Sequence, residues 1–145
     1  MADLIDIVKI ISRESGWREK QPEADGRVRY DLENGPVLEI FTPDHQSAVF
    51  LSTVAQLPPT ADTDEACRGM ARLASAVFSR RRSVLSYRDG VFSLHQSASL
   101  KDTPDSHWPE ICASFLDDCD WWREQAVEAM GEAAPAFSAF GGLRP

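Results

Sequence analysis

The sequence lacks a long hydrophobic run and an N-terminus that resembles a secretion signal. No apolar stretch approaches the roughly 18 residues that a membrane-spanning helix needs. The first residues, MADLID, place acidic side chains where a secretion signal carries positive charge. We therefore expect no membrane association, and the sequence predicts a cytoplasmic protein.

The sequence also has too little positive charge for a protein that binds nucleic acid. It contains 15 Lys and Arg against 23 Asp and Glu, which gives a formal net charge of -8. Binding to a phosphate backbone requires clustered cations that displace counterions, so nucleic acid is not an expected partner. An acidic surface attracts basic protein segments, although it also serves solubility alone.

Cysteine is scarce and shows no paired spacing. The chain contains Cys67, Cys112 and Cys119, an odd number without a CxxC motif. The last two would lie about two turns apart on one helix, too far to share a metal ion without strain. Neither a disulfide framework nor a metal site is indicated, and we expect buried thiols.

Local signatures of catalysis are missing as well. The sequence contains no Walker loop and no GxGxxG, HExxH or GxSxG motif. The histidines His45, His95 and His107 are scattered, and none has a base or nucleophile beside it in sequence. We expect neither an enzyme nor a bound cofactor, and turnover abolished by one His or Cys substitution would reverse this view.

The first half of the chain shows helical and then strand periodicity. Residues 3–14 have a helical apolar pattern that Gly16 would end in a left-handed conformation. Strands are predicted over 27–33 and 37–42, joined by an Asn34-Gly35 hairpin. Residues 47–57 are apolar on both faces, which predicts a third strand that is covered on both sides.

The second half repeats this alternation. Asp62 or Thr63 can begin an amphipathic helix that runs to Phe78, and strands over 84–88 and 91–100 flank an Asp89-Gly90 turn. A last helix is predicted from near Thr103 or Ser106 to Gly131. Its acidic residues are expected to form a solvated face: Asp117, Asp118, Asp120, Glu124 and Glu128.

These elements predict an α+β fold in the order α-β-β-β-α-β-β-α. The hairpin turns favour a twisted antiparallel sheet with helices packed on it. A length of 145 residues with 43% hydrophobic residues is sufficient for one core, so residues 1–131 are expected to form a single domain. Residues 132–145 are rich in Ala, Gly and Pro and are expected to be a flexible tail.

Two features exceed what one core requires. The apolar arc of residues 3–14 spans roughly 220°, whereas one packing contact uses about 100°. Trp121 and Trp122 are adjacent, so they point about 100° apart on a helix and cannot both face a narrow core stripe. The surplus apolar surface can be covered by the same chain, by a second copy or by another protein.

The element order resembles the class I type III secretion chaperones, the Tir-chaperone-like family. The resemblance covers residues 3–130, and three segments carry it best. They are the Asp25-Gly26 turn before the first strands, the hairpin segment YRDGVFSL at residues 87–94, and the helix from Trp108 onward. Small size and acidity agree with it. The resemblance implies a non-enzymatic bacterial cytoplasmic protein that keeps a secreted effector soluble and secretion-competent.

The resemblance also implies two surfaces. The first joins a homodimer through the middle helix and the strands after it, here Val77, Phe78, Val84, Leu85 and Tyr87. The second holds an extended, non-globular segment near the N-terminus of the effector, here Ile5, Val28, Tyr30, Leu32, Leu38 and Ile40. The alternative function is another small α+β binding module, such as an immunity or adaptor protein that recognises a folded partner.

Overall fold

The computed structural model describes residues 2–33 and 36–130. Their elements, in chain order, are α1 (Leu4–Ser15), β1 (Val28–Asp31), β2 (Val37–Phe41), β3 (Ser47–Gln56), α2 (Thr63–Val77), β4 (Val84–Arg88), β5 (Val91–Ser99), a 3-10 turn (Asp105–His107) and α3 (Trp108–Ala129). The predicted α+β fold and element order are confirmed. The Asn34-Gly35 hairpin and the tail over 132–145 lie outside the described residues.

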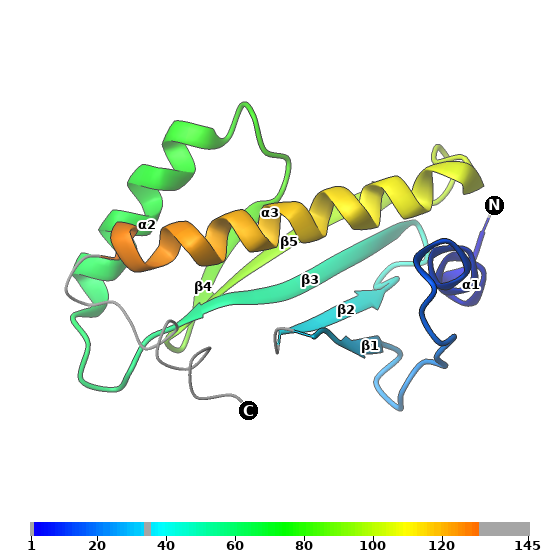
Figure 1. Ribbon diagram of the computed structural model, residues 1–145, viewed down its shortest axis with the longest axis horizontal. Coiled ribbons are helices and arrows are strands. Elements are labelled where there is room, and N and C mark those ends of the chain that lie inside the picture. The colour runs from blue at the N-terminus through cyan, green and yellow to red at the C-terminus, as the bar shows by residue number, and fades with distance from the viewer. Residues whose placement is uncertain (1, 34–35, 131–145) are drawn as a thin grey trace.

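The strands in the described part of the chain form one antiparallel sheet in the order β1-β2-β3-β5-β4. β3 and β5 make the longest pairing, from Ser47 opposite Ser99 to Gln56 opposite Val91, with a bulge near Thr53. Figure 1 shows α3 lying along this central pair, α1 near the β1–β2 side, and α2 beside the C-terminal part of α3. β1 and β4 are therefore the edges of the sheet.

The ends of α1 and α2 follow the signals in the sequence. Asp3 caps α1 by accepting a hydrogen bond from the Asp6 amide, and the Asp6 side chain accepts one from the Asp3 amide. Gly16 ends α1 with φ of 73°, a left-handed conformation that glycine adopts without steric cost. Asp62 caps α2 through the Glu65 amide. Gly16 and Asp62 match the predicted end signals, and α1 begins one residue after the predicted start at residue 3.

The core lies between the helices and one face of the sheet. β1, β2 and the first eight residues of β3 alternate between buried and more exposed side chains, as expected when one sheet face is covered. Phe50 is buried and its ring lies 6.1 Å from that of Phe115 on α3. Val49 and Leu51 are half-buried and point to the opposite face. The prediction that β3 is covered on both faces is therefore wrong for the isolated chain.

α3 supplies the largest core side chains and corrects one expectation. Trp122 is 2% exposed whereas Trp121 is half-buried, so the prediction that these neighbours face different surroundings is confirmed. Asp118 is only 6% exposed, although the acidic residues of this helix were all expected to be solvated. The reason is a cluster of polar partners contributed by the segment between α2 and β4.

Candidate functional site

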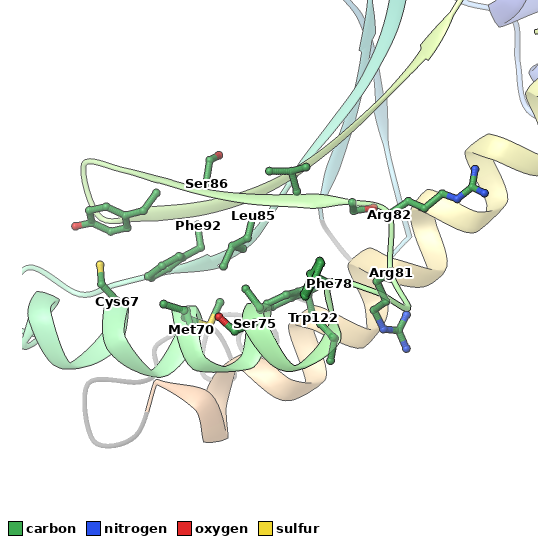
Figure 2. A pocket seen from close by; sticks show the side chains of 16 residues that line it. Cys67, Met70, Ser75, Phe78, Arg81, Arg82, Leu85, Ser86, Phe92 and Trp122 are labelled. Atoms are coloured by element: carbon green, nitrogen blue, oxygen red, sulfur yellow. The ribbon is translucent and has the colours of Figure 1, made fainter. Parts of the chain in front are cut away.

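An apolar groove of about 670 Å³ lies between α2 and β4. We call it the α2–β4 groove. Figure 2 shows Leu85 and Phe92 pointing from the sheet toward α2, with Met70 and Cys67 on the helix side. Trp122 of α3 closes its floor. A volume of this size is within the range of protein sites that receive several side chains or a small molecule.

The groove exists because α2 and β4 carry more apolar surface than the chain covers. α2 buries Ala66, Met70 and Val77, and its helical structure ends at Val77. The next residue, Phe78, leaves 78% of its surface exposed. β4 is an edge strand, and Leu85 is its one partly covered residue. The apolar positions of both elements therefore face a common space.

The structure brings together all five residues that were expected at a dimer interface. Val77 is buried and Leu85 half-buried, whereas Phe78, Val84 and Tyr87 are 78%, 52% and 39% exposed. All five line the α2–β4 groove. Large exposed apolar side chains grouped around one groove are typical of a surface that another protein covers.

One end of the groove is held by aromatic packing. The Tyr87 ring lies 4.9 Å from that of Phe92 on the paired strand. The Tyr87 hydroxyl also accepts a hydrogen bond of 3.0 Å from the Gly90 amide in the β4–β5 turn. Tyr87 is therefore oriented by contacts within its own hairpin.

Six residues were expected to bind an extended effector segment, which we call the client. They do not form one exposed surface. Val28, Leu38 and Ile40 are fully buried and Tyr30 is 6% exposed. These four belong to the core beneath the helices. A client could reach them only if the covering helix moved away from the sheet. Ile5 is 48% exposed on α1, and Leu32 is half-buried after β1.

A second cavity, of about 430 Å³, lies beside the exposed residue of α1. We call it the α1 pocket. Its apolar lining comes from the start of α1, from the segment before β1 and from the end of β2: Leu4, Ile5, Pro22, Phe41 and Pro43. Asp3, Asp25 and His45 also line it. The pocket therefore combines an apolar floor with a mainly acidic rim.

Ion pairs fix the sheet edge next to the α1 pocket. The Arg29 guanidinium lies 2.9 Å from Glu23 and 3.1 Å from Glu39, and it also pairs with Asp25. The hydrogen bond from Arg29 holds the pKa of Asp25 below its usual value. Arg27 lies 3.1 Å from Glu39 and 4.0 Å from the centre of the Phe41 ring. These charges are largely satisfied within the chain, so the cavity offers mainly its apolar surface to a ligand.

The buried titratable groups do not assemble into a reactive site. Burial raises the pKa of Cys112 and of Cys119 to about 12, so both remain neutral thiols. Arg123 donates to the Ser52 hydroxyl at 2.8 Å and to the Thr53 carbonyl at 3.0 Å, which anchors α3 to the bulge of β3. Among residues 2–33 and 36–130, no three His, Cys, Asp or Glu side chains are placed to hold a metal ion.

Asp118, which contacts the segment between α2 and β4, is a residue that sequence reasoning missed. Arg81 donates to it at 2.8 Å and Ser83 at 2.7 Å. Both partners precede it by more than thirty positions, so helical spacing could not reveal the contact. The Arg80-Arg81-Arg82 run was a visible signal, but its favourable position after a helix already accounted for it.

Comparisons with known proteins identify the fold. Neither a family model nor a curated sequence matches the chain. The Yersinia pestis type III secretion chaperone SycH, solved with a fragment of YscM2, has a TM-score of 0.58 at 13% identity. The match covers 81% of this chain and 98% of that one.

Two further complexes contain chains of the same fold. A chain of the ExsC–ExsE complex has a TM-score of 0.64 at 11% identity, over 85% of this chain and 96% of that one. A chain of the HopA1–SchA chaperone–effector complex has a TM-score of 0.60 at 15% identity, over 86% and 99%. In the described part of this chain no helix could cross a membrane. The protein thus has the fold of the type III secretion chaperones, as its element order suggested.

Proposed function

We propose that the protein is a type III secretion chaperone. It acts as a homodimer in the bacterial cytoplasm and holds an extended segment of a secreted effector, which stays soluble and competent for secretion. The observation that carries the proposal is the shared fold, over 81% to 86% of this chain, with chains of chaperone and chaperone–effector complexes. The surfaces that the isolated chain leaves uncovered support it.

The α2–β4 groove supports pairing of two copies. In a two-fold symmetric dimer the same patch faces itself, so each copy would offer a Phe78 ring and receive one. Phe78 is 78% exposed beside a groove of about 670 Å³, so a ring and a receiving space lie on the same patch. Burying one such ring removes roughly 150 Å² of apolar surface from water, worth about 4 kcal/mol before the costs of association.

The α1 pocket supports binding of a client. Ile5 leaves 48% of its surface exposed beside a cavity of about 430 Å³, which suits an apolar side chain of an extended segment. Leu32 provides a further half-buried contact at the end of β1. Val28, Tyr30, Leu38 and Ile40 would act indirectly in this proposal, because they support α1 from below.

Co-expression with the secreted effectors of the source bacterium tests the proposal. We expect one effector to form a complex in which its N-terminal segment resists proteolysis, although the same segment is digested when it is alone. Amide hydrogen exchange on the complex should show that the protected segment is extended and not a folded domain. Light scattering should give a mass of two chains for the unliganded protein at micromolar concentration.

Two results would contradict parts of the proposal. A monomer mass at micromolar concentration would remove the homodimer. Binding only to partners that are already folded, with no protected extended segment, would favour the immunity or adaptor function instead.

A further inference from the structure

The segment between α2 and β4 is held by one buried carboxylate. The Arg81 guanidinium donates to one oxygen of Asp118 at 2.8 Å, and the Ser83 hydroxyl donates to the other at 2.7 Å. The Asp118 side chain is 9% exposed and that of Arg81 is 27% exposed. The Ser83 hydroxyl also lies 3.2 Å from the side-chain amide of Gln96 on β5. We call Asp118, Arg81 and Ser83 the carboxylate latch.

The carboxylate latch is continuous with the α2–β4 groove. Arg81 and Ser83 themselves line the groove. The Arg81 guanidinium stacks 4.2 Å from the centre of the Trp121 ring, and that ring meets Trp122 edge-on at 5.5 Å. Trp122 is the side chain of α3 that lines the groove. A substitution in the carboxylate latch should therefore alter the groove at Arg81 and Ser83 directly, and at Trp122 through Trp121.

Without the latch, little would fix this segment. α2 ends at Val77, and the amides of Arg80 and Arg81 both donate to its carbonyl in a short turn. Regular pairing starts again only at Val84, opposite His95. Between these points the chain has neither helix nor strand structure, so side-chain contacts must determine its path. The two most exposed apolar residues of the groove, Phe78 and Val84, flank this stretch.

We propose that Asp118 is a positioning residue for pairing of two copies: through Arg81 and Ser83 it fixes the segment that presents Phe78 and Val84. The inference rests on the proposed homodimer. Asp118 does not contact the second copy in this arrangement. It lowers the entropy that the segment would lose on association, so two preformed surfaces meet. Charge-assisted hydrogen bonds in a partly buried setting are suited to this task because they are strong and directional.

The test compares Asp118→Asn with Asp117→Asn. Both remove one negative charge from adjacent positions of α3, but Asp117 is exposed. We expect Asp118→Asn to raise amide exchange over residues 79–83 about tenfold, and to raise the dimer dissociation constant about tenfold. Asp117→Asn should change neither by more than about twofold. Sedimentation equilibrium gives the dissociation constant, and urea unfolding gives the global stability of each variant.

The outcomes separate the latch from general stabilisation. The inference is wrong if amide exchange over 79–83 rises no more than the fall in global stability explains. It is also wrong if exchange rises while the dissociation constant is unchanged.

If Asp118→Asn fails to fold, Ser83→Ala is the deciding variant, because it removes only one hydroxyl. We expect it to raise both the exchange rate over 79–83 and the dimer dissociation constant about threefold, and no change in either would overturn the inference. A monomeric wild type would refute the proposed dimer, and with it the role in pairing. The exchange comparison would still report whether the latch holds the segment.

Discussion

Gly69 of α2 lies directly against the backbone of Ala129 of α3. A Cβ atom at position 69 would overlap the Ala129 carbonyl group and would approach Met130 to 3.5 Å. The φ angle of Gly69 is not in the left-handed region, so this position requires glycine for its small size and not for its backbone conformation. The contact between Gly69 and Ala129 sets how closely α2 approaches α3 where the two helices cross, and α2 forms one wall of the α2–β4 groove.

Gly69→Ala should therefore destabilise the protein, although alanine favours helices. Steric overlap with the Ala129 backbone must push α2 and α3 apart, at a cost of about 1–3 kcal/mol in the free energy of unfolding. Urea unfolding followed by circular dichroism measures this cost. Ala76→Ser, on the exposed face of the same helix, should stay within about 0.5 kcal/mol of wild type. Equal stability of Gly69→Ala and wild type would mean that the crossing adapts without loss.

The elements of this fold could be predicted because each has a local cause. Gly16 ends α1 in the left-handed conformation that the sequence predicted, whereas the capping box of Asp3 became apparent in the structure. The Asp89-Gly90 turn, with both residues at positive φ, joins β4 and β5 as predicted. The need for glycine at position 69 had no such local signal. It arises from contact with Ala129, which lies sixty residues further along the chain.

Phe78→Ser should disrupt the proposed dimer and leave the monomer intact. The ring is 78% exposed, so its loss should change the free energy of unfolding of the monomer by less than about 0.5 kcal/mol. A buried aromatic anchor contributes at least about 2 kcal/mol to association, which corresponds to about a thirtyfold higher dissociation constant. Sedimentation equilibrium checks this, with Ser79→Ala as a matched control at the next exposed position. Unchanged dimerisation would exclude Phe78 from the interface.

Ile5→Asp should weaken client binding without affecting dimerisation. Ile5 is 48% exposed in the first turn of α1, where an acidic residue interacts favourably with the helix dipole, so α1 should keep its stability. A charge beside the α1 pocket must be desolvated when an apolar client side chain enters. We expect at least about a tenfold loss of affinity for the protected effector segment, measured by titration calorimetry.

Arg13→Gln provides the control for Ile5→Asp. It changes the net charge by the same amount on the same helix, about two turns away at an exposed position. Its client affinity should stay close to that of wild type. If both variants weaken binding equally, the effect comes from overall charge and not from the α1 pocket.

The site could be predicted only in part, because a strand pattern does not say which face is covered. Val28 and Ile40 alternate correctly with more exposed residues, but alternation alone could not show that their face is the core face. The dimer residues came from the family resemblance, since helical periodicity alone placed Phe78 among the core positions of α2. In the structure α2 ends at Val77, and Phe78 is 78% exposed. Asp118 could not be recognised because its partners lie on a segment without regular structure.

The three cysteines should differ in reactivity. Burial raises the pKa of Cys112 and Cys119 to about 12, so both thiols stay protonated at pH 8. A raised thiol pKa keeps the neutral, unreactive form until the pH approaches that value. Cys67 is half-buried in the α2–β4 groove, and its pKa is also raised by burial, but the thiol can be reached.

A disulfide reagent should therefore modify Cys67 first in the folded protein and all three cysteines in denaturant. Cys67→Ser should leave the folded protein almost unreactive. Reaction at Cys67 should also slow as the protein concentration rises, because the proposed second copy covers the groove. Equal rates at all three thiols of the folded protein would contradict the burial of Cys112 and Cys119.

Tyr30→Phe tests whether α1 stays on the sheet when a client binds. The Tyr30 and Ser12 hydroxyls lie 2.7 Å apart, and both residues are buried. Removing the Tyr30 hydroxyl leaves Ser12 without this partner, at a cost of about 1–2 kcal/mol in the free energy of unfolding. Ser12→Ala together with Tyr30→Phe should lose less than the sum of the single losses, by at least about 0.5 kcal/mol.

Client affinity of the same variants then separates two modes of binding. If a client displaced α1 to reach Val28 and Ile40, weakening the Ser12–Tyr30 contact would make that opening easier and would tighten binding. If α1 stays in place and the client uses the α1 pocket, Tyr30→Phe should bind with an affinity within about twofold of wild type. We expect the second result, because displacing α1 would expose Ile7, Val8 and Ile11, which are almost completely buried. Tighter binding would return the core residues of β1 and β2 to the client surface.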